Sequence, residues 1–96
     1  MVTKRAIYSN LAVHPGEALA LELAERELTQ HDLARMMGQP SQAISELVRG
    51  KKRLTAKTAL QLERALEIPA HIWLSLQAEY DLVRAREESA SEDNEP

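Results

Sequence analysis

The chain has 96 residues, a net charge of -3 and no cysteine. This length predicts one domain with a single core, and the lack of cysteine excludes a disulfide framework and a thiolate metal site. No stretch reaches the roughly 20 apolar residues of a membrane span, and the first residues lack the apolar core of a secretory signal, so we expect a cytoplasmic protein with no membrane partner.

The spacing of apolar residues predicts five helices and no strand, which makes a compact all-α domain over residues 14–88. Residues 1–13 show little pattern and are expected to form an N-terminal arm. The first helix is expected to begin at His14-Pro-Gly-Glu17, because a first helical position suits proline and the positive end of a helix suits glutamate. We expect this helix to run to about Glu27.

A second and a third helix are predicted in close succession. Thr29 can cap the second helix, with Asp32 as the reciprocal partner of a capping box, and Gly38 ends it because glycine enters the left-handed conformation at little cost. The third helix is expected to have Gln39 as an extended cap and Pro40 as its first residue, because a residue before proline disfavours helix.

The third helix has two different faces. Ile44, Leu47 and Val48 have the spacing of a buried side. The opposite side carries short polar groups that can hydrogen-bond base edges, and it ends in a cation that suits phosphate or guanine. These polar residues are Ser41, Gln42, Ser45, Glu46 and Arg49. Such a pair of short helices, followed by a basic loop, is typical of proteins that read DNA.

Two more helices are predicted toward the C-terminus. Thr55 is expected to cap the fourth helix, and Pro69 separates it from a fifth helix over about residues 70–87. The fifth helix has an apolar stripe that either completes the core or forms a dimer interface. The stripe consists of Ile72, Trp73, Leu76, Tyr80 and Val83. Residues 89–96 have no apolar residue larger than alanine and are expected to be a disordered acidic tail.

Charge is distributed unevenly along the chain. From Thr29 to Leu60 there are six basic and two acidic residues, a balance of +4, whereas Glu79 to Pro96 has two basic and seven acidic residues, a balance of -5. Lysine and arginine bind DNA by displacing counterions from phosphate. The asymmetry therefore indicates a basic face for nucleic acid and an acidic tail that faces elsewhere. The alternative is that these charges only form a solvated surface.

Several separated motifs recur here with the spacing of a known family. They are His14-Pro-Gly-Glu17, Leu28-Thr-Gln30, Leu33-Ala34, Gly38, Ile44-Ser-Glu-Leu47 with Gly50-Lys51, Leu54-Thr-Ala56, Thr58-Ala59, Leu62, and Trp73-Leu-Ser-Leu-Gln-Ala78 followed by Tyr80-Asp-Leu82. Over about residues 13–86 the chain resembles the HigA-type antitoxins, which are helix-turn-helix proteins of the Cro/C1 (xenobiotic-response-element) type. The resemblance implies a lambda-repressor-like fold.

The resemblance also implies a function. HigA-type proteins neutralise a partner toxin, usually a small basic ribonuclease of the RelE-like fold, and they repress their own operon by binding double-stranded operator DNA. We therefore expect a nucleoid-associated homodimer that acts by binding. The alternatives are a solitary repressor without a toxin and, more distantly, an adaptor that has lost DNA binding.

Catalysis is not expected. The histidines, His14, His31 and His71, are scattered along the sequence, and neither a glycine-rich phosphate loop nor a nucleophile motif occurs. No metal ion or cofactor is expected either.

The resemblance assigns roles to individual residues. Ser41, Gln42 and Ser45 match base-reading positions, with Gln42 foremost because its amide can pair bidentately with adenine. The expected phosphate contacts are Thr29, Gln30, Arg49, Lys51, Lys52 and Arg53.

Two features depart from the family pattern. Relatives usually have an aliphatic residue and then serine or threonine after the turn glycine, whereas this chain has Gln39 and Pro40. Proline cannot donate a backbone N–H to phosphate. In addition, Glu46 lies close to the expected groove, and we expect it to pair with Arg49.

Overall fold

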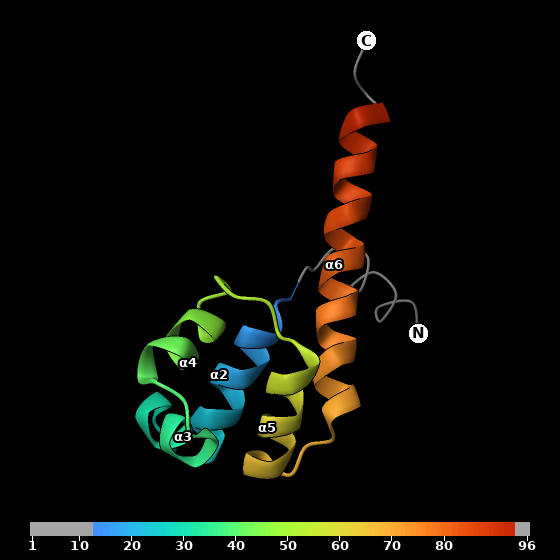
Figure 1. The fold of residues 1–96 in the computed structure, drawn as a ribbon. Helices are drawn as coiled ribbons and strands as arrows, with labels where there is room; N and C mark the ends of the chain where they lie inside the picture. Colours follow the sequence, from blue (N-terminus) through green and yellow to red (C-terminus); the bar gives the residue numbers. More distant parts are fainter. Residues whose placement is uncertain (1–12, 94–96) are drawn as a thin grey trace.

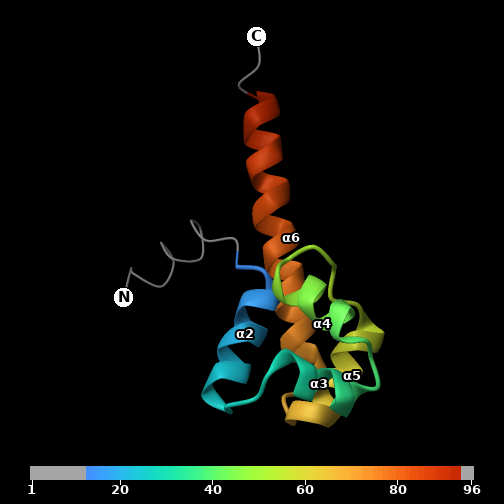
Figure 2. The ribbon, with the colours of Figure 1, turned by 90° about the vertical axis from the view of Figure 1, so that its left-hand side faces the viewer.

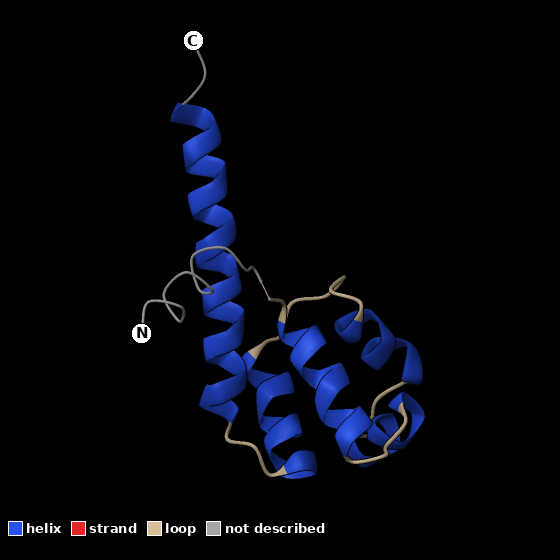
Figure 3. Cartoon of the chain, turned by 180° about the vertical axis from the view of Figure 1, so that it is seen from behind, coloured by secondary structure: helices blue, strands red, loops and turns tan. Residues whose placement is uncertain are grey.

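Helices account for most of the residues that the computed structural model describes, which are residues 13–93. They are α2 (Pro15–Glu25), α3 (Gln30–Met37), α4 (Ser41–Val48), α5 (Ala56–Leu66) and α6 (Ala70–Asp93). Helices α2 to α5 form a rounded body, and α6 runs along one side of it and projects beyond it (Figures 1 and 3). No strand occurs in residues 13–93, so the predicted all-α fold of five helices is confirmed. The predicted arm lies outside the described residues, except for Val13.

Helix α2 begins where the sequence predicts. His14 is its N-cap, and the Nδ1 atom of the ring accepts the Gly16 backbone N–H at 2.9 Å. The helix ends at Glu25, which is earlier than expected. It ends there because Glu27 adopts a left-handed φ of 58° and the Leu28 amide bonds back to a carbonyl of the last turn at 2.9 Å, a common C-terminal capping geometry.

Helix α3 has the capping box that the sequence predicts. The Thr29 hydroxyl accepts the Asp32 N–H, and the Asp32 carboxylate accepts the Thr29 N–H, both at 2.9 Å. At the other end Gly38 has a left-handed φ of 67°, a conformation that is easily reached only by glycine. Both ends of α3 are therefore fixed by local sequence.

The predicted start of α4 is wrong by one residue. Pro40, with φ -65° and ψ 148°, is the N-cap, and Ser41 is the first helical residue. The reason lies in α3, because the Gln39 N–H bonds back to the Ala34 carbonyl at 2.9 Å and so completes the end of that helix. The cap of α4 therefore falls on Pro40, whose carbonyl accepts the Ala43 N–H at 3.0 Å.

The core lies among the helices of the body, and Trp73 of α6 completes it on one side. Its largest fully buried side chains are Trp73, Leu19, Leu33, Ile44, Leu54, Leu62 and Leu66. Helix α6 packs on α5 and α2, and α2 packs on α4. Gly16 permits the last of these contacts, because a β-carbon there would collide with the backbone carbonyls of Leu47 and Val48. The C-terminal end of α4 therefore rests directly on the first turn of α2.

The predicted apolar stripe of α6 divides into buried and open parts. Trp73 and Val83 have only 1% and 6% of their surfaces exposed, whereas Ile72 has 43% exposed. Leu76 and Tyr80 are half-buried. Trp73 and Val83 therefore belong to the core of the protomer itself, and Ile72 is the member of the stripe that is most open to another molecule.

Helix α6 is longer than predicted. The expected tail was residues 89–96, but the helix continues to Asp93, and residues 94–96 lie outside the described part. The run Arg84-Ala-Arg-Glu-Glu88 directly before this segment consists of strong helix formers, and Arg84 and Glu87 form an ion pair at 3.7 Å. Within residues 13–93, no helix has the length and apolar character needed to cross a membrane.

Candidate nucleic-acid interface

Helices α3 and α4 lie against each other around the turn at Gly38 (Figure 2). Their N-terminal ends are joined by a hydrogen bond of 3.0 Å between His31 Nδ1 and Ser41 Oγ. Helix α3 packs on α5, and α4 packs on α2. The remaining sides of both helices face solvent, which is the arrangement that lets a second helix enter a DNA groove.

The exposed face of α4 carries the predicted base-reading residues. Ser41 and Gln42 are exposed, and Ser45 is half-buried one turn later. The Gln42 amide donates to the Glu46 carboxylate at 3.3 Å. The predicted pair of Glu46 with Arg49 does not form in the described structure, because Arg49 has left the helix as its C-cap whereas Gln42 lies one turn back on the same face.

The N-terminal end of α3 combines a cap with a charged pair. The Thr29 hydroxyl is engaged in the capping box, and Gln30 follows as the first residue of the helix. Hydrogen bonds from Thr29, with smaller help from Arg35, hold the pKa of the Asp32 carboxyl below its ordinary value. The Nη2 atom of Arg35 lies 3.0 Å from Asp32 Oδ1 and forms an ion pair with it. Of the two residues predicted to meet phosphate here, Thr29 uses its hydroxyl oxygen as an acceptor in the cap, which leaves the hydroxyl proton to donate to a phosphate.

The loop after α4 presents two lysines to solvent. Gly50 turns the chain with a left-handed φ of 76°, and the Lys51 N–H bonds back to the Glu46 carbonyl at 2.9 Å. Lys51 and Lys52 are exposed, as is Arg49 at the end of α4. These three cations lie on the chain directly after the predicted base-reading residues, where a positioning contact with phosphate would be useful.

Arg53, the third cation of this loop, is occupied elsewhere. Its guanidinium donates to both carboxylate oxygens of Asp81 on α6, at 3.0 and 2.9 Å. This pair joins residues 28 positions apart, so local sequence patterns could not reveal it. The only feature of the sequence that drew attention to Asp81 was the Tyr80-Asp-Leu82 motif, to which we assigned no separate role.

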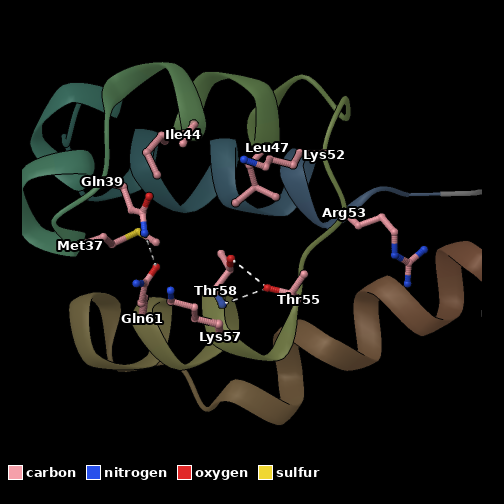
Figure 4. A pocket seen from close by; sticks show the side chains of 11 residues that line it. Met37, Gln39, Ile44, Leu47, Lys52, Arg53, Thr55, Lys57, Thr58 and Gln61 are labelled. Carbon is pink, nitrogen blue, oxygen red and sulfur yellow. Dashed lines mark hydrogen bonds between the residues drawn. The ribbon is translucent and has the colours of Figure 1, made fainter.

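A shallow pocket lies between α4, α5 and the basic loop (Figure 4). It has a volume of about 240 Å³, and Lys52 and Lys57 are among its lining residues. Gln39 turns toward α5, where its amide donates to Gln61 at 3.2 Å. In the described part of the chain, no three side chains of histidine, cysteine, aspartate or glutamate gather closely enough to hold a metal ion.

Sequence reasoning gave no role to two residues at this surface. His31 is exposed and bonded to Ser41, a predicted base reader. Lys57 lies in the first turn of α5 beside the basic loop. Its position could have been found from the predicted cap at Thr55, whereas the contact of His31 depends on how α3 and α4 pack.

Comparison with known proteins identifies the family. The sequence profile of the helix-turn-helix family matches residues 19–73, more than half of the chain. The chain is 40% identical over 81 residues to "Virulence-associated protein I" of Dichelobacter nodosus, covering 83% of this chain and 75% of that protein. The chain belongs to the Cro/C1 (xenobiotic-response-element) type of helix-turn-helix proteins.

Solved structures of this helix-turn-helix family include antitoxins. An addiction module antidote protein of the HigA family from Coxiella burnetii superposes with a TM-score of 0.78 at 31% identity, covering 88% of this chain and 95% of that one. The Pseudomonas aeruginosa antitoxin HigA, solved with the higBA promoter, superposes with a TM-score of 0.80 at 29% identity, covering 88% of this chain and 92% of that one. The HigA resemblance seen in the sequence is therefore confirmed in the fold.

Proposed function

We propose that this protein is the DNA-binding antitoxin of a toxin–antitoxin pair and that it represses its own operon. The observation that carries the proposal is the solvent-facing side of α4, where Ser41 and Gln42 are exposed. The start of this helix is bonded to α3, and its end rests on α2. The likeness to a HigA antitoxin solved with promoter DNA supports it.

In the proposed complex, α4 enters the major groove. Gln42 reads an adenine through its amide, with Ser41 and Ser45 as further base contacts. The bond from Gln42 to Glu46 is exposed, so DNA can replace it. Sequence-independent affinity comes from phosphate contacts by Arg49, Lys51, Lys52 and the N-terminal end of α3 at Thr29 and Gln30.

The protein would bind its operator as a homodimer, because two-fold symmetric sites require two copies of the reading helix. We place the dimer contact near Ile72. There a groove of about 340 Å³ runs between α2 and α6, lined by Leu21, Ile68, Ile72 and Leu76. Leu21 and Ile72 are both substantially exposed, and such apolar surface favours association.

The toxin partner would be a small basic ribonuclease of the RelE-like fold, neutralised by binding alone. The acidic end of α6 supports a basic partner, because opposite charges speed encounter and favour correct pairing. Arg84 and Arg86 are the only basic residues after Glu79 in the sequence.

Two experiments test this function. Purified protein should bind its own promoter with a log–log salt slope on the order of -5, if each protomer of a dimer uses three cations on phosphate. We expect a small basic toxin to be encoded beside this protein, and co-expression should relieve the growth arrest that the toxin causes. DNA binding without relief would favour a solitary repressor, and a salt slope near zero would favour an adaptor.

A further inference from the structure

We propose that Asp81 limits the affinity of this protein for DNA by holding Arg53 away from the phosphate backbone. The inference rests on the proposed DNA binding, and it concerns a residue of α6 that lies outside the helix-turn-helix. In the sequence Arg53 is the third cation of the basic loop. In the structure its side chain points toward α6, whereas the amine of Lys52 points the opposite way, toward α4 (Figure 4).

The geometry of the pair explains why Asp81 can compete with DNA. The two nitrogens at the end of Arg53 each donate to one oxygen of Asp81, at 3.0 and 2.9 Å. This is the same two-pronged contact that arginine makes with phosphate. With its end-on pair of nitrogens bound to Asp81, the guanidinium of Arg53 has only its Nε side left for a phosphate, and the Asp81 carboxylate offsets its charge and repels the phosphate.

Asp81 is itself held in place. The Gln77 amide nitrogen donates to Asp81 Oδ1 at 3.0 Å, and Gln77 is 4% exposed. The Gln77 oxygen accepts the Leu54 backbone N–H at 2.8 Å. One buried side chain therefore fixes both the carboxylate and the chain directly after Arg53, so the two partners are brought together before any DNA is present.

Hydrogen bonds keep Asp81 ionised at neutral pH. The bonds from Arg53, which have the larger effect, and from Gln77 lower the pKa of the Asp81 carboxyl below its ordinary value. The Arg53 side chain remains 67% exposed. It is therefore accessible to solvent and DNA once Asp81 no longer holds it, which makes the proposal testable by a single change of charge.

The test compares full-length variants by the salt dependence of their binding to the operator and to an unrelated duplex. Asp81→Asn keeps an oxygen for Gln77 and removes the charge that holds Arg53. We expect tighter binding to both duplexes and a log–log slope steeper by about 0.9 per protomer, the value for one added phosphate contact. Arg53→Ala alone should leave the wild-type slope unchanged, and it should abolish the gain when combined with Asp81→Asn.

Glu79→Gln is the matched control. Glu79 is exposed on the same helix, and its replacement changes the net charge by the same amount without releasing Arg53. We expect its slope to equal that of the wild type. The control separates the release of one particular cation from a general loss of negative charge.

Other outcomes would overturn the proposal. If Arg53→Ala flattens the wild-type slope, Arg53 already contacts phosphate. If Asp81→Asn lowers the melting temperature and leaves the slope unchanged, Asp81 has only a structural role. If the wild-type protein binds no duplex in a salt-dependent way, the proposed DNA function fails and the inference fails with it.

Discussion

His14 and Tyr80 meet edge to face, with ring centroids 4.9 Å apart and ring planes at 79°. His14 caps α2, and Tyr80 lies in the middle of α6, so the contact joins the first helix of the body to the last helix of the chain. The His14 ring also lies beside Gly50 in the loop after α4. Burial lowers the pKa of His14 below its ordinary value of 6.5, and the charges of Glu17 and Asp81 only partly oppose this.

The stability of the fold should fall in mild acid because of His14. Its Nδ1 must stay unprotonated to accept the Gly16 amide, and folding lowers its pKa, so the unfolded chain takes up the proton more readily. The contribution of His14 to the free energy of unfolding is therefore complete above about pH 6.5 and is lost as the pH falls below that value. We expect the melting temperature to fall more between about pH 7.5 and about pH 5.5 in the wild type than in His14→Asn, where asparagine can still cap the helix.

His71→Asn is the control for this experiment, since His71 is exposed on α6. This variant should show the same fall in melting temperature as the wild type. An equal fall in the wild type and in His14→Asn would show that other groups cause the acid sensitivity.

Gly16 should tolerate alanine less well than Gly38, although it lies inside a helix where alanine is usually preferred. A β-carbon at residue 16 would collide with backbone carbonyls of α4, whereas one at residue 38 meets nothing within 4 Å. We expect Gly16→Ala to lower the free energy of unfolding by about 2 kcal/mol, as overpacking does, and Gly38→Ala by about 1 kcal/mol for its left-handed backbone. Urea titration followed by fluorescence of the single, buried Trp73 would measure both, and the reverse order would refute the close packing.

Gln42 and Lys51 should affect DNA binding in different ways. Gln42→Ala should weaken binding to the operator by about 1 to 3 kcal/mol, the size of a good bidentate base contact, and should change binding to an unrelated duplex little. Lys51→Ala should weaken binding to both duplexes equally and flatten the salt slope by about 0.9 per protomer. Equilibrium titration of each variant on both duplexes distinguishes these results, and equal effects of the two substitutions would contradict the assigned roles.

Ile72 should control the oligomeric state. Ile72→Glu introduces a charge into the groove between α2 and α6, where we place the dimer contact, and burying an unpaired carboxylate is strongly unfavourable. We expect sedimentation equilibrium to show a shift from dimer to monomer. Leu60→Glu on α5 is the control, because Leu60 is 53% exposed and lies outside that groove. A dimeric Ile72→Glu variant would show that the interface lies elsewhere, and a monomeric wild type would show that this dimer does not form.

The sequence predicted features of the fold whose causes are local. The caps at Thr29 and Thr55 each bind an amide three residues away, so short motifs contain all the information they need. The start of α4 was missed because it depends on where the Gln39 amide bonds in the preceding helix. The length of α6 was missed because the lack of apolar residues larger than alanine in residues 89–96 does not reveal that the strong helix formers directly before them carry the helix on to Asp93.

The candidate site was only partly predictable for a related reason. The exposed positions of Ser41 and Gln42 follow from helical periodicity, which places Ile44 and Leu47 in the core. The partners of the charged groups depend on more than periodicity. Arg53 meets Asp81 because the fold brings α6 beside the loop after α4, and Glu46 takes Gln42 instead of Arg49 because Arg49 is the C-cap of α4.

The projecting end of α6 changes how the overall charge of the protein should be understood. The segment after Arg86 holds five carboxylates and no basic residue. Without that segment, the net charge of -3 would become +2. This segment, most of which lies on the projecting end of α6 (Figure 1), therefore accounts for the negative charge of the molecule, whereas residues 29–60, which include α3, α4 and the basic loop, carry a balance of +4. The isoelectric point of about 5.6 is thus an average over a basic helix-turn-helix and an acidic end.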